Sequence, residues 1–222
     1  MAEARSRVKA VVLDLGGVVF RIGWHGVVEH LRKGTGPSSG SRPSRPDLSP
    51  ALVEELAATI PTWQPYDQYE RGLLSTESFF SEFRHRFKLN EFEHDEVLAA
   101  WLGLIEAPLP GVDALLSEMK GLTALHALSN TNPAHLEKVL HGHSVMAHFD
   151  RVFTSVGLGL RKPELEIYRR VAVSLGLPPE QILFVDDLPA NVEGARQAGM
   201  QAEQCLNSVG RLRGIFARYL AG

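Results

Sequence analysis

The chain has 222 residues, 44% of them hydrophobic and 22% charged, a balance typical of one globular domain with room for an inserted subdomain. A formal net charge of −3 argues against nucleic acid or an anionic membrane as a partner, and no apolar run reaches the ~20 residues of a membrane span. The single cysteine, Cys205, excludes an internal disulfide, so we expect a cytoplasmic protein.

The apolar stretch VVLDLGGVVF, residues 11–20, opens with a predicted strand that ends on one carboxylate, Asp14, with two glycines close behind it. The long stretch that follows shows no convincing strand and has four amphipathic helical patterns. They are GVVEHLRK, PALVEELAATI, STESFFSEFRHRF and EHDEVLAAWLGLIEA. We therefore predict a helical cap over residues 22–106, inserted into a core domain of residues 1–21 and 107–222.

Four more apolar runs follow, each with turn residues behind it: LTALHALSNTN, RVFTSVGLG, QILFVDDLP and MQAEQCL. Helical patterns accompany them: GVDALLSEMKG, PAHLEKVLHG, PELEIYRRVAVSLG and NVEGARQAG. Continuous apolar strands that alternate with helices indicate a parallel sheet covered on both faces. The predicted fold is therefore α/β, with a doubly wound parallel sheet and the inserted helical cap.

Polar side chains follow three of the predicted strands at the point where each strand ends. They are Asp14 after the first, Ser129 and Asn130 after the second, and Asp186 and Asp187 after ILFV. Ligands of open α/β sheets bind beyond the carboxyl ends of the strands, so we expect these side chains to meet. One aspartate after a strand is commonly only a turn former, but three carboxylates at one edge repel one another unless a cation is present. A hard divalent ion with oxygen ligands, Mg²⁺, resolves that repulsion.

The other groups expected at this edge suit a phosphate. Ser129 supplies a hydroxyl, and Gly17 and Asn130 supply backbone N–H groups at turns that begin helices. Lys162, predicted to open the helix KPELEIY, supplies a positive charge. A carboxylate nucleophile, a metal ion, a lysine and amide donors together form a site for phosphoryl transfer through an aspartyl-phosphate.

Four segments, in this order, resemble the four motifs of the haloacid dehalogenase-like hydrolase superfamily: VVLDLGGVV, HALSN, LRKPELEIY and FVDDLPANVEGARQAG. The resemblance spans residues 8–205, and the predicted cap lies where this superfamily has a small helical cap. YERGLLSTESF, residues 69–79, also resembles the cap segment of a bacterial subgroup that includes glucose-1-phosphate phosphatases. The resemblance implies a Rossmann-like hydrolase core that acts on a small phosphorylated metabolite, as a monomer or homodimer.

The resemblance also implies roles for single residues. Asp14 is the nucleophile, and Ser129 binds the phosphoryl group that is transferred. Lys162 neutralises the charge of that phosphoryl group and of Asp14. Glu70 and Arg71 lie on the cap and face the substrate.

The implied magnesium ligands are the carboxylates of Asp14, Asp186 and Asp187 and the backbone carbonyl of Gly16. The side chain of Asn191 supports this metal site without binding the ion. The ligand set is therefore made of oxygen atoms alone, as Mg²⁺ prefers.

Gly16 departs from the superfamily pattern, in which most phosphatases carry a second aspartate at this place to protonate the leaving group. A glycine offers its carbonyl to a metal but transfers no proton, and the loss of a general acid costs about 10²–10⁴ in rate for a poor leaving group. The enzyme is then slow, takes a proton from Glu70 or His25 of the cap, or uses substrates with weakly basic leaving groups. We favour the last option, which anomeric sugar phosphates and acyl or aryl phosphates satisfy.

Two alternatives stay open at this point. A haloacid dehalogenase uses the same nucleophile and also lacks the second aspartate, but that chemistry needs no metal and leaves Asp186 and Asp187 without a role. A non-catalytic binding protein on the same fold would make Gly16 a mark of decay, which the retained Asp14 and Lys162 argue against. Activity on a simple aryl phosphate, with and without Mg²⁺, separates the three.

Overall fold

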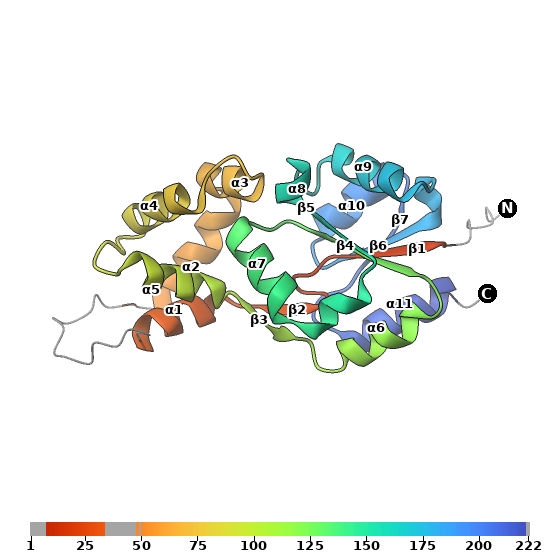
Figure 1. Cartoon of the computed structure of the whole chain (residues 1–222), viewed down its shortest axis with the longest axis horizontal. Coiled ribbons are helices and arrows are strands. Elements are labelled where there is room, and N and C mark those ends of the chain that lie inside the picture. Colours follow the sequence, from red (N-terminus) through yellow and green to blue (C-terminus); the bar gives the residue numbers. More distant parts are fainter. Residues whose placement is uncertain (1–7, 34–47, 49, 221–222) are drawn as a thin grey trace.

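A computed structural model describes residues 8–33, 48 and 50–220 of the chain. Its centre is a five-stranded parallel sheet in the order β5-β4-β1-β6-β7. The strands are β1 (Ala10–Leu13), β4 (Ala124–Ser129), β5 (Arg151–Thr154), β6 (Ile182–Asp186) and β7 (Gln201–Gln204). The five predicted strands and the predicted α/β fold are therefore confirmed, and helices cover both faces of the sheet (Figure 1).

The middle strand, β1, explains why the apolar runs are continuous. All its residues are buried, and successive side chains of a strand point to opposite faces. Val11 and Leu13 pack in one core with α6 (Val112–Lys120) and α11 (Val209–Leu220). Val12 packs in a second core on the other face, with α9 (Leu165–Leu175) and α10 (Pro189–Gln197). A strand covered on both faces needs apolar residues at every position.

Three strand ends meet at one edge of the sheet. Leu13 of β1 is in register with Ala127 of β4 and with Val185 of β6, so the residues that follow these strands are neighbours. The chain passes from β1 to β4 on one side and returns to β6 on the other side, which makes this edge the topological switch point. Ligands of open α/β sheets bind at such a point.

The cap has a core of its own. Its helices are α1 (Trp24–Lys33), α2 (Pro50–Thr59), α3 (Gln64–Glu70), α4 (Thr76–Arg86) and α5 (His94–Leu102), with a 3₁₀ turn at Ile60–Thr62. Aromatic rings fill the space between them: Tyr69 stacks on Phe79 at 4.3 Å, and Trp101 meets Phe79, Phe80 and Phe83 edge-on or at an angle. The four predicted helices are present, and α3 is an addition to them.

The prediction that no strand lies between β1 and β4 was wrong. Residues Phe20–Ile22 form β2 and Ile105–Pro108 form β3, and these two short strands pair antiparallel where the chain enters and leaves the cap (Figure 1). The helix predicted to run through EHDEVLAAWLGLIEA ends at Leu102 because its last residues pair with β2 instead. The predicted limits of the cap, residues 22 and 106, fall within these strands.

The remaining elements complete the core. They are α7 (Pro133–Gly142), α8 (Ser155–Leu158), and 3₁₀ turns at Ser144–His148 and Pro179–Gln181. The helix after Lys162, predicted to begin there, begins at Leu165, so the lysine lies in the preceding loop. Among the described residues, no helix combines the length and the hydropathy that crossing a membrane requires.

Candidate active site

The buried lysine is the centre of the polar cluster at the sheet edge. Lys162 Nζ lies 2.8 Å from an Asp14 carboxylate oxygen and 2.6 Å from an Asp186 carboxylate oxygen. The Lys162 side chain is 1% exposed, so these two contacts are made away from bulk water. The structure thus brings together three residues that stand far apart in the sequence, and it places them at the carboxyl ends of β1 and β6.

The cluster carries more negative charge than its lysine balances. Burial raises the pKa of Asp14 to about 7, against the opposing effect of Lys162. Burial, together with the charge of Asp186, raises the pKa of Asp187 to about 6. Burial alone would lower the pKa of Lys162, but its two carboxylate neighbours outweigh this and raise it. Three acids beside one ammonium group favour the binding of a further cation.

The acids are close enough to share such a cation. Asp14, Asp186 and Asp187 each offer one oxygen atom, and the three atoms lie within 4.8 Å of one another. Because all the donors are carboxylate oxygens, the set fits a hard ion such as Mg²⁺. Asp186 is fully buried, and its oxygens already accept hydrogen bonds from Lys162, from the Leu188 N–H and from the Asn191 amide. Asp14 and Asp187 are therefore the more available ligands.

The two glycines after Asp14 differ in what the backbone demands. Gly17 has φ +68°, and a Cβ there would lie 2.6 Å from Asp187, so only glycine fits beside this acid. Its N–H donates to the carbonyl of Phe20 at 2.8 Å, and this bond inside the turn contradicts its predicted use as a free phosphate donor. Gly16 has no left-handed φ, and a Cβ there would lie 3.2 Å from the Ile22 side chain and 4.0 Å from an Asp14 carboxylate oxygen.

Two asparagines hold the charged residues in place. The Asn130 amide donates to the Lys162 carbonyl at 3.0 Å and accepts from the Lys162 N–H at 2.9 Å, which fixes the loop that carries the lysine. The Asn191 amide donates to both oxygens of Asp186, at 2.9 and 3.1 Å. Asn191 thus holds Asp186, one of the three acids of the cluster, in place. Ser129, at the end of β4, lines the same cavity as Asp14.

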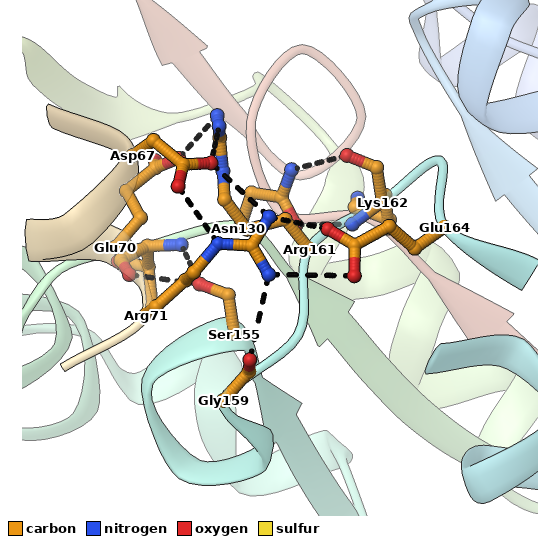
Figure 2. A network of polar contacts seen from close by, with 10 residues as sticks. Asp67, Glu70, Arg71, Asn130, Ser155, Gly159, Arg161, Lys162 and Glu164 are labelled. Carbon is orange, nitrogen blue, oxygen red and sulfur yellow. Dashed lines mark hydrogen bonds and ion pairs between the residues drawn. The ribbon is translucent and has the colours of Figure 1, made fainter. Parts of the chain in front are cut away.

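Figure 2 shows how the cap reaches this site through charged side chains. Glu70 is 2% exposed, lines the cavity and pairs with Arg161 at 2.6 Å. Burial raises the pKa of Glu70 in spite of that arginine. Arg161 also binds Asp67 of α3 at 2.7 Å. The Arg161 side chain therefore links the core loop to two cap carboxylates at the edge of the cavity.

Three further residues differ from what the sequence analysis expected. Arg71 does not face the cavity: it binds Asp67 at 2.8 Å and Glu164 of the core, and so fastens the cap to the core. His25 is exposed and is not among the residues that line the cavity. Arg161 does line it and was missed, although its place beside Lys162 in LRKPE is a signal for it.

The site opens into a cavity of about 310 Å³ between the core and the cap. Asp14, Ser129 and Lys162 contribute to its wall from the core, and Glu70 contributes from the cap. The structure therefore encloses the predicted nucleophile in a space of the size that small-ligand sites have, about 300–1,000 Å³.

Helix α7 makes a second link between core and cap, through His135. Its ring stacks on Trp101, with centroids 5.2 Å apart, and its Nε2 lies 2.8 Å from the Trp101 carbonyl. Burial lowers the pKa of His135 from 6.5 to about 4. Because the folded state holds this ring neutral, its contribution to stability is present above pH 6.5 and is lost as the pH falls from 6.5 towards 4.

We expect the His135 contribution to the free energy of unfolding to fall by about 2 kcal/mol between pH 8 and pH 5. Urea unfolding of wild type and His135→Gln checks this. The variant should have the lower free energy of unfolding at pH 8, and the difference between the two proteins should be about 2 kcal/mol smaller at pH 5. The control is His141→Gln, at an exposed position of the same helix, which should leave the pH dependence unchanged. If the difference in free energy of unfolding between wild type and His135→Gln does not change with pH, His135 does not stay neutral in the folded state.

The fold is thus a doubly wound sheet with an inserted cap, and its middle strand is followed by a buried carboxylate beside a lysine and two more acids. The chain matches the family model described as "Hydrolase: haloacid dehalogenase-like hydrolase" over residues 8–199. The protein therefore belongs to this family and is a hydrolase, which confirms the superfamily resemblance seen in the motifs.

Three curated relatives have similar sequences. Drimenol cyclase drtB of Aspergillus calidoustus is 28% identical over 88% of the chain, which spans only 33% of that relative. Sesquiterpene phosphatase astK of Aspergillus oryzae is 27% identical over 86% of the chain and 87% of the relative. D-ribitol-5-phosphate phosphatase of Bacteroides thetaiotaomicron is 28% identical over 89% of the chain and 91% of the relative.

A solved structure supports the fold. A HAD-family enzyme from Bacteroides thetaiotaomicron, crystallised with magnesium and inorganic phosphate, superposes with a TM-score of 0.74. It is 21% identical, and the match covers 92% of this chain and 98% of that chain. The fold of this chain is thus that of a solved HAD-family enzyme.

Proposed function

We propose that the protein is a Mg²⁺-dependent phosphatase that hydrolyses the phosphate monoester of a small metabolite through an aspartyl-phosphate. The observation that carries the proposal is the pairing of Asp14 with Lys162 inside a cluster of three acids. The relatives named as phosphatases support phosphate-ester chemistry, and the magnesium complex of the structural neighbour supports the choice of ion.

Each core residue then has a part in the reaction. A carboxylate oxygen of Asp14 attacks phosphorus, so a bond from Asp14 to phosphorus forms while the ester bond to the leaving oxygen breaks. Lys162 and the Ser129 hydroxyl stabilise the charge on the phosphoryl oxygens, together with the Asn130 backbone N–H. Water then attacks phosphorus, which releases phosphate and restores the Asp14 carboxylate. Mg²⁺, held by Asp14, Asp187 and the Gly16 carbonyl beside Asp186, would neutralise the repulsion between carboxylate and phosphate.

The proposed reaction uses a leaving group that departs without a general acid. Were the cap to supply a proton instead, Glu70 is the better placed of the two cap residues considered. It lines the cavity, whereas His25 does not. Its raised pKa, caused by burial, keeps more of the carboxyl group protonated near neutral pH than an exposed glutamate would be. Arg161, bound to Glu70 at 2.6 Å, is suited to stabilise the carboxylate after the proton has left.

The alternative chemistries fit this arrangement less well. A metal-independent dehalogenase gives no role to Asp187, which lies close enough to Asp14 to share a cation and adds negative charge to the cluster. A non-catalytic protein gives no role to a buried lysine bound to two acids. The expected glucose-1-phosphate phosphatase subgroup, the cytoplasmic location and the monomer or homodimer remain predictions from sequence.

The names of the relatives point to two kinds of ester. The ribitol-5-phosphate relative supports the sugar-phosphate expectation, because ribitol is a sugar alcohol. The sesquiterpene phosphatase relative supports an apolar alcohol instead. The proposed function therefore covers phosphate esters of sugar alcohols and of apolar alcohols. The side chains that line the cavity distinguish between these two kinds of ester.

We expect chelator-treated enzyme to lose activity on an aryl phosphate and to regain it when Mg²⁺ is added. Asp187→Asn should weaken Mg²⁺ binding by about 10²-fold, because it removes a charged oxygen ligand. Calorimetry of Mg²⁺ binding and initial rates at graded Mg²⁺ concentrations check both effects. Glu180→Gln, at an exposed acid outside the cluster, is the matched control and should bind Mg²⁺ as wild type does. Full activity in excess chelator would overturn the metal requirement.

A further inference from the structure

The cavity beside Asp14 has a mostly apolar wall. Aliphatic side chains and one indole ring reach it from both the core and the cap: Ile22, Trp24, Ile60, Leu104, Leu136 and Leu188. They come from β2, the α1 start, the 3₁₀ turn of the cap, the approach to β3, α7, and the loop after β6. The apolar lining is thus a surface assembled from many elements and is not one exposed helix face.

Two of these side chains lie partly in water at the cavity. Ile22 is 40% exposed and Leu188 is 53% exposed, although large aliphatic residues are usually buried. Leu188 directly follows Asp187, and Ile22 contacts the position of a Gly16 Cβ, so both lie beside the reacting carboxylates. An apolar ligand group that covers them would gain stability from the surface it removes from water.

Most polar side chains of the cavity already have partners within the protein. Both ring nitrogens of His135 are engaged, by Asn132 and by the Trp101 carbonyl. The Asn130 amide is bound to Lys162, and Arg161 is bound to Glu70 and Asp67 through its terminal nitrogens, while its Nε has no hydrogen-bond partner within the described part of the chain. A polyol would place several hydroxyls against this wall with few free partners, and each unpaired buried hydroxyl costs free energy.

We propose that the substrate, given the proposed phosphatase function, is the phosphate monoester of an apolar alcohol whose hydrocarbon part lies against this wall. The phosphate occupies the polar end, at Asp14, Ser129 and Lys162. The alcohol is of moderate size, since the cavity of about 310 Å³ is at the small end of ligand sites. Sugar phosphates, favoured from the sequence, are then poor substrates.

A series of straight-chain primary alkyl phosphates, from ethyl to octyl, tests this proposal at nearly constant leaving-group basicity. We expect kcat/KM to rise by about fourfold for each added methylene until the cavity is filled. Ribitol 5-phosphate, also a primary ester, should be at least about 10²-fold poorer than hexyl phosphate. A flat chain-length series, or a preference for the polyol ester, would overturn the proposal.

Acetyl phosphate separates this inference from the function on which it rests. It has an activated leaving group and almost no hydrocarbon surface, so a Mg²⁺-dependent phosphatase should hydrolyse it whatever the wall prefers. If acetyl phosphate is hydrolysed but kcat/KM does not change with alkyl chain length, the apolar substrate is rejected and the phosphatase function stands. If neither acetyl phosphate nor any alkyl phosphate is hydrolysed, the phosphatase function is rejected.

Variants at the wall give the second test. Ile22→Thr should lower the ratio of kcat/KM for octyl over ethyl phosphate by about tenfold, because apolar surface is lost from the wall. Leu140→Thr is the matched control: Leu140 is also 40% exposed but does not line the cavity, so the ratio should stay unchanged. Leu188→Thr repeats the test from another element should Ile22→Thr fold poorly. An unchanged ratio in the folded wall variants would contradict the proposal.

Discussion

Asp14→Asn is expected to lower kcat on an aryl phosphate by about 10⁴-fold or more. An amide oxygen does not serve as the attacking nucleophile, and loss of the nucleophile removes the covalent route altogether. The substitution keeps the shape of the side chain, and Lys162 keeps its contact with Asp186 at 2.6 Å. Steady-state rates measured at saturating Mg²⁺ check the effect.

The fold should tolerate this change, so the loss is chemical. Burial raises the pKa of Asp14 from 3.8 to about 7, which means that the ionised carboxylate reduces stability increasingly as the pH rises through that range. Removing the charge should therefore leave the melting temperature at pH 8 equal to that of wild type or higher. A large fall in melting temperature would show that Asp14 is needed for folding instead.

The covalent intermediate supplies the matching positive result. Wild-type enzyme quenched with acid during turnover should carry phosphate that hydroxylamine releases, as an acyl phosphate does, and Asp14→Asn should carry none. Ser129→Ala is the control, because it removes one donor to the phosphoryl oxygens and should cost about 10²–10³ in rate while the intermediate still forms. Residual activity of Asp14→Asn above about 1% would exclude Asp14 as the nucleophile.

Gly16→Asp is expected to increase kcat/KM for primary alkyl phosphates by about 10²-fold while changing that for aryl phosphates little. A carboxyl group at this position would protonate a basic alkoxide, whereas a phenolate leaves without that help. Gly16 has no left-handed φ that would bar a side chain. Its added Cβ would lie 3.2 Å from the Ile22 side chain, which has to shift slightly, and 4.0 Å from an Asp14 carboxylate oxygen. A plot of log kcat/KM against leaving-group pKa should be steep for wild type and flatter for the variant.

Gly16→Asn is the matched control, because it has nearly the same volume and supplies no carboxylic acid proton. It should keep the wild-type slope. A flat slope already in the wild type, with chemistry shown to be rate-limiting, would mean that the cap supplies the proton. Glu70→Gln should then make the slope steep, since Glu70 is the carboxylic acid of the cap that lines the cavity among the residues the structure describes.

Local pattern was sufficient for the central sheet and for the catalytic edge. Each strand buried on both faces needs an unbroken apolar run, and a run of that kind is visible in the sequence without knowledge of its neighbours. Parallel strands end at the same edge, so the pattern alone groups the residues that follow β1, β4 and β6. Asp14, Ser129 and Asp186 therefore came together as predicted.

Contacts between distant segments were not predictable in this way. β2 and β3 are three and four residues long and form because they pair with each other from opposite ends of the cap, so neither carries a strand signal alone. The sequence places Arg161 beside Lys162, but that place does not say which side chains its guanidinium group contacts. Only the approach of α3 to the loop before α9 determines that Arg161 lines the cavity while Arg71 binds Glu164 at its outside.

The sequence by itself thus determined the class of fold, the order of its core elements and the polar groups at the edge of the sheet. The tertiary structure decided which cap residues face those groups and what kind of wall surrounds the cavity. The reason is physical: an apolar side chain that lines a cavity and one that fills a core have the same hydrophobicity and the same periodicity. They differ only in whether another part of the chain covers them, and that depends on how the cap packs on the core.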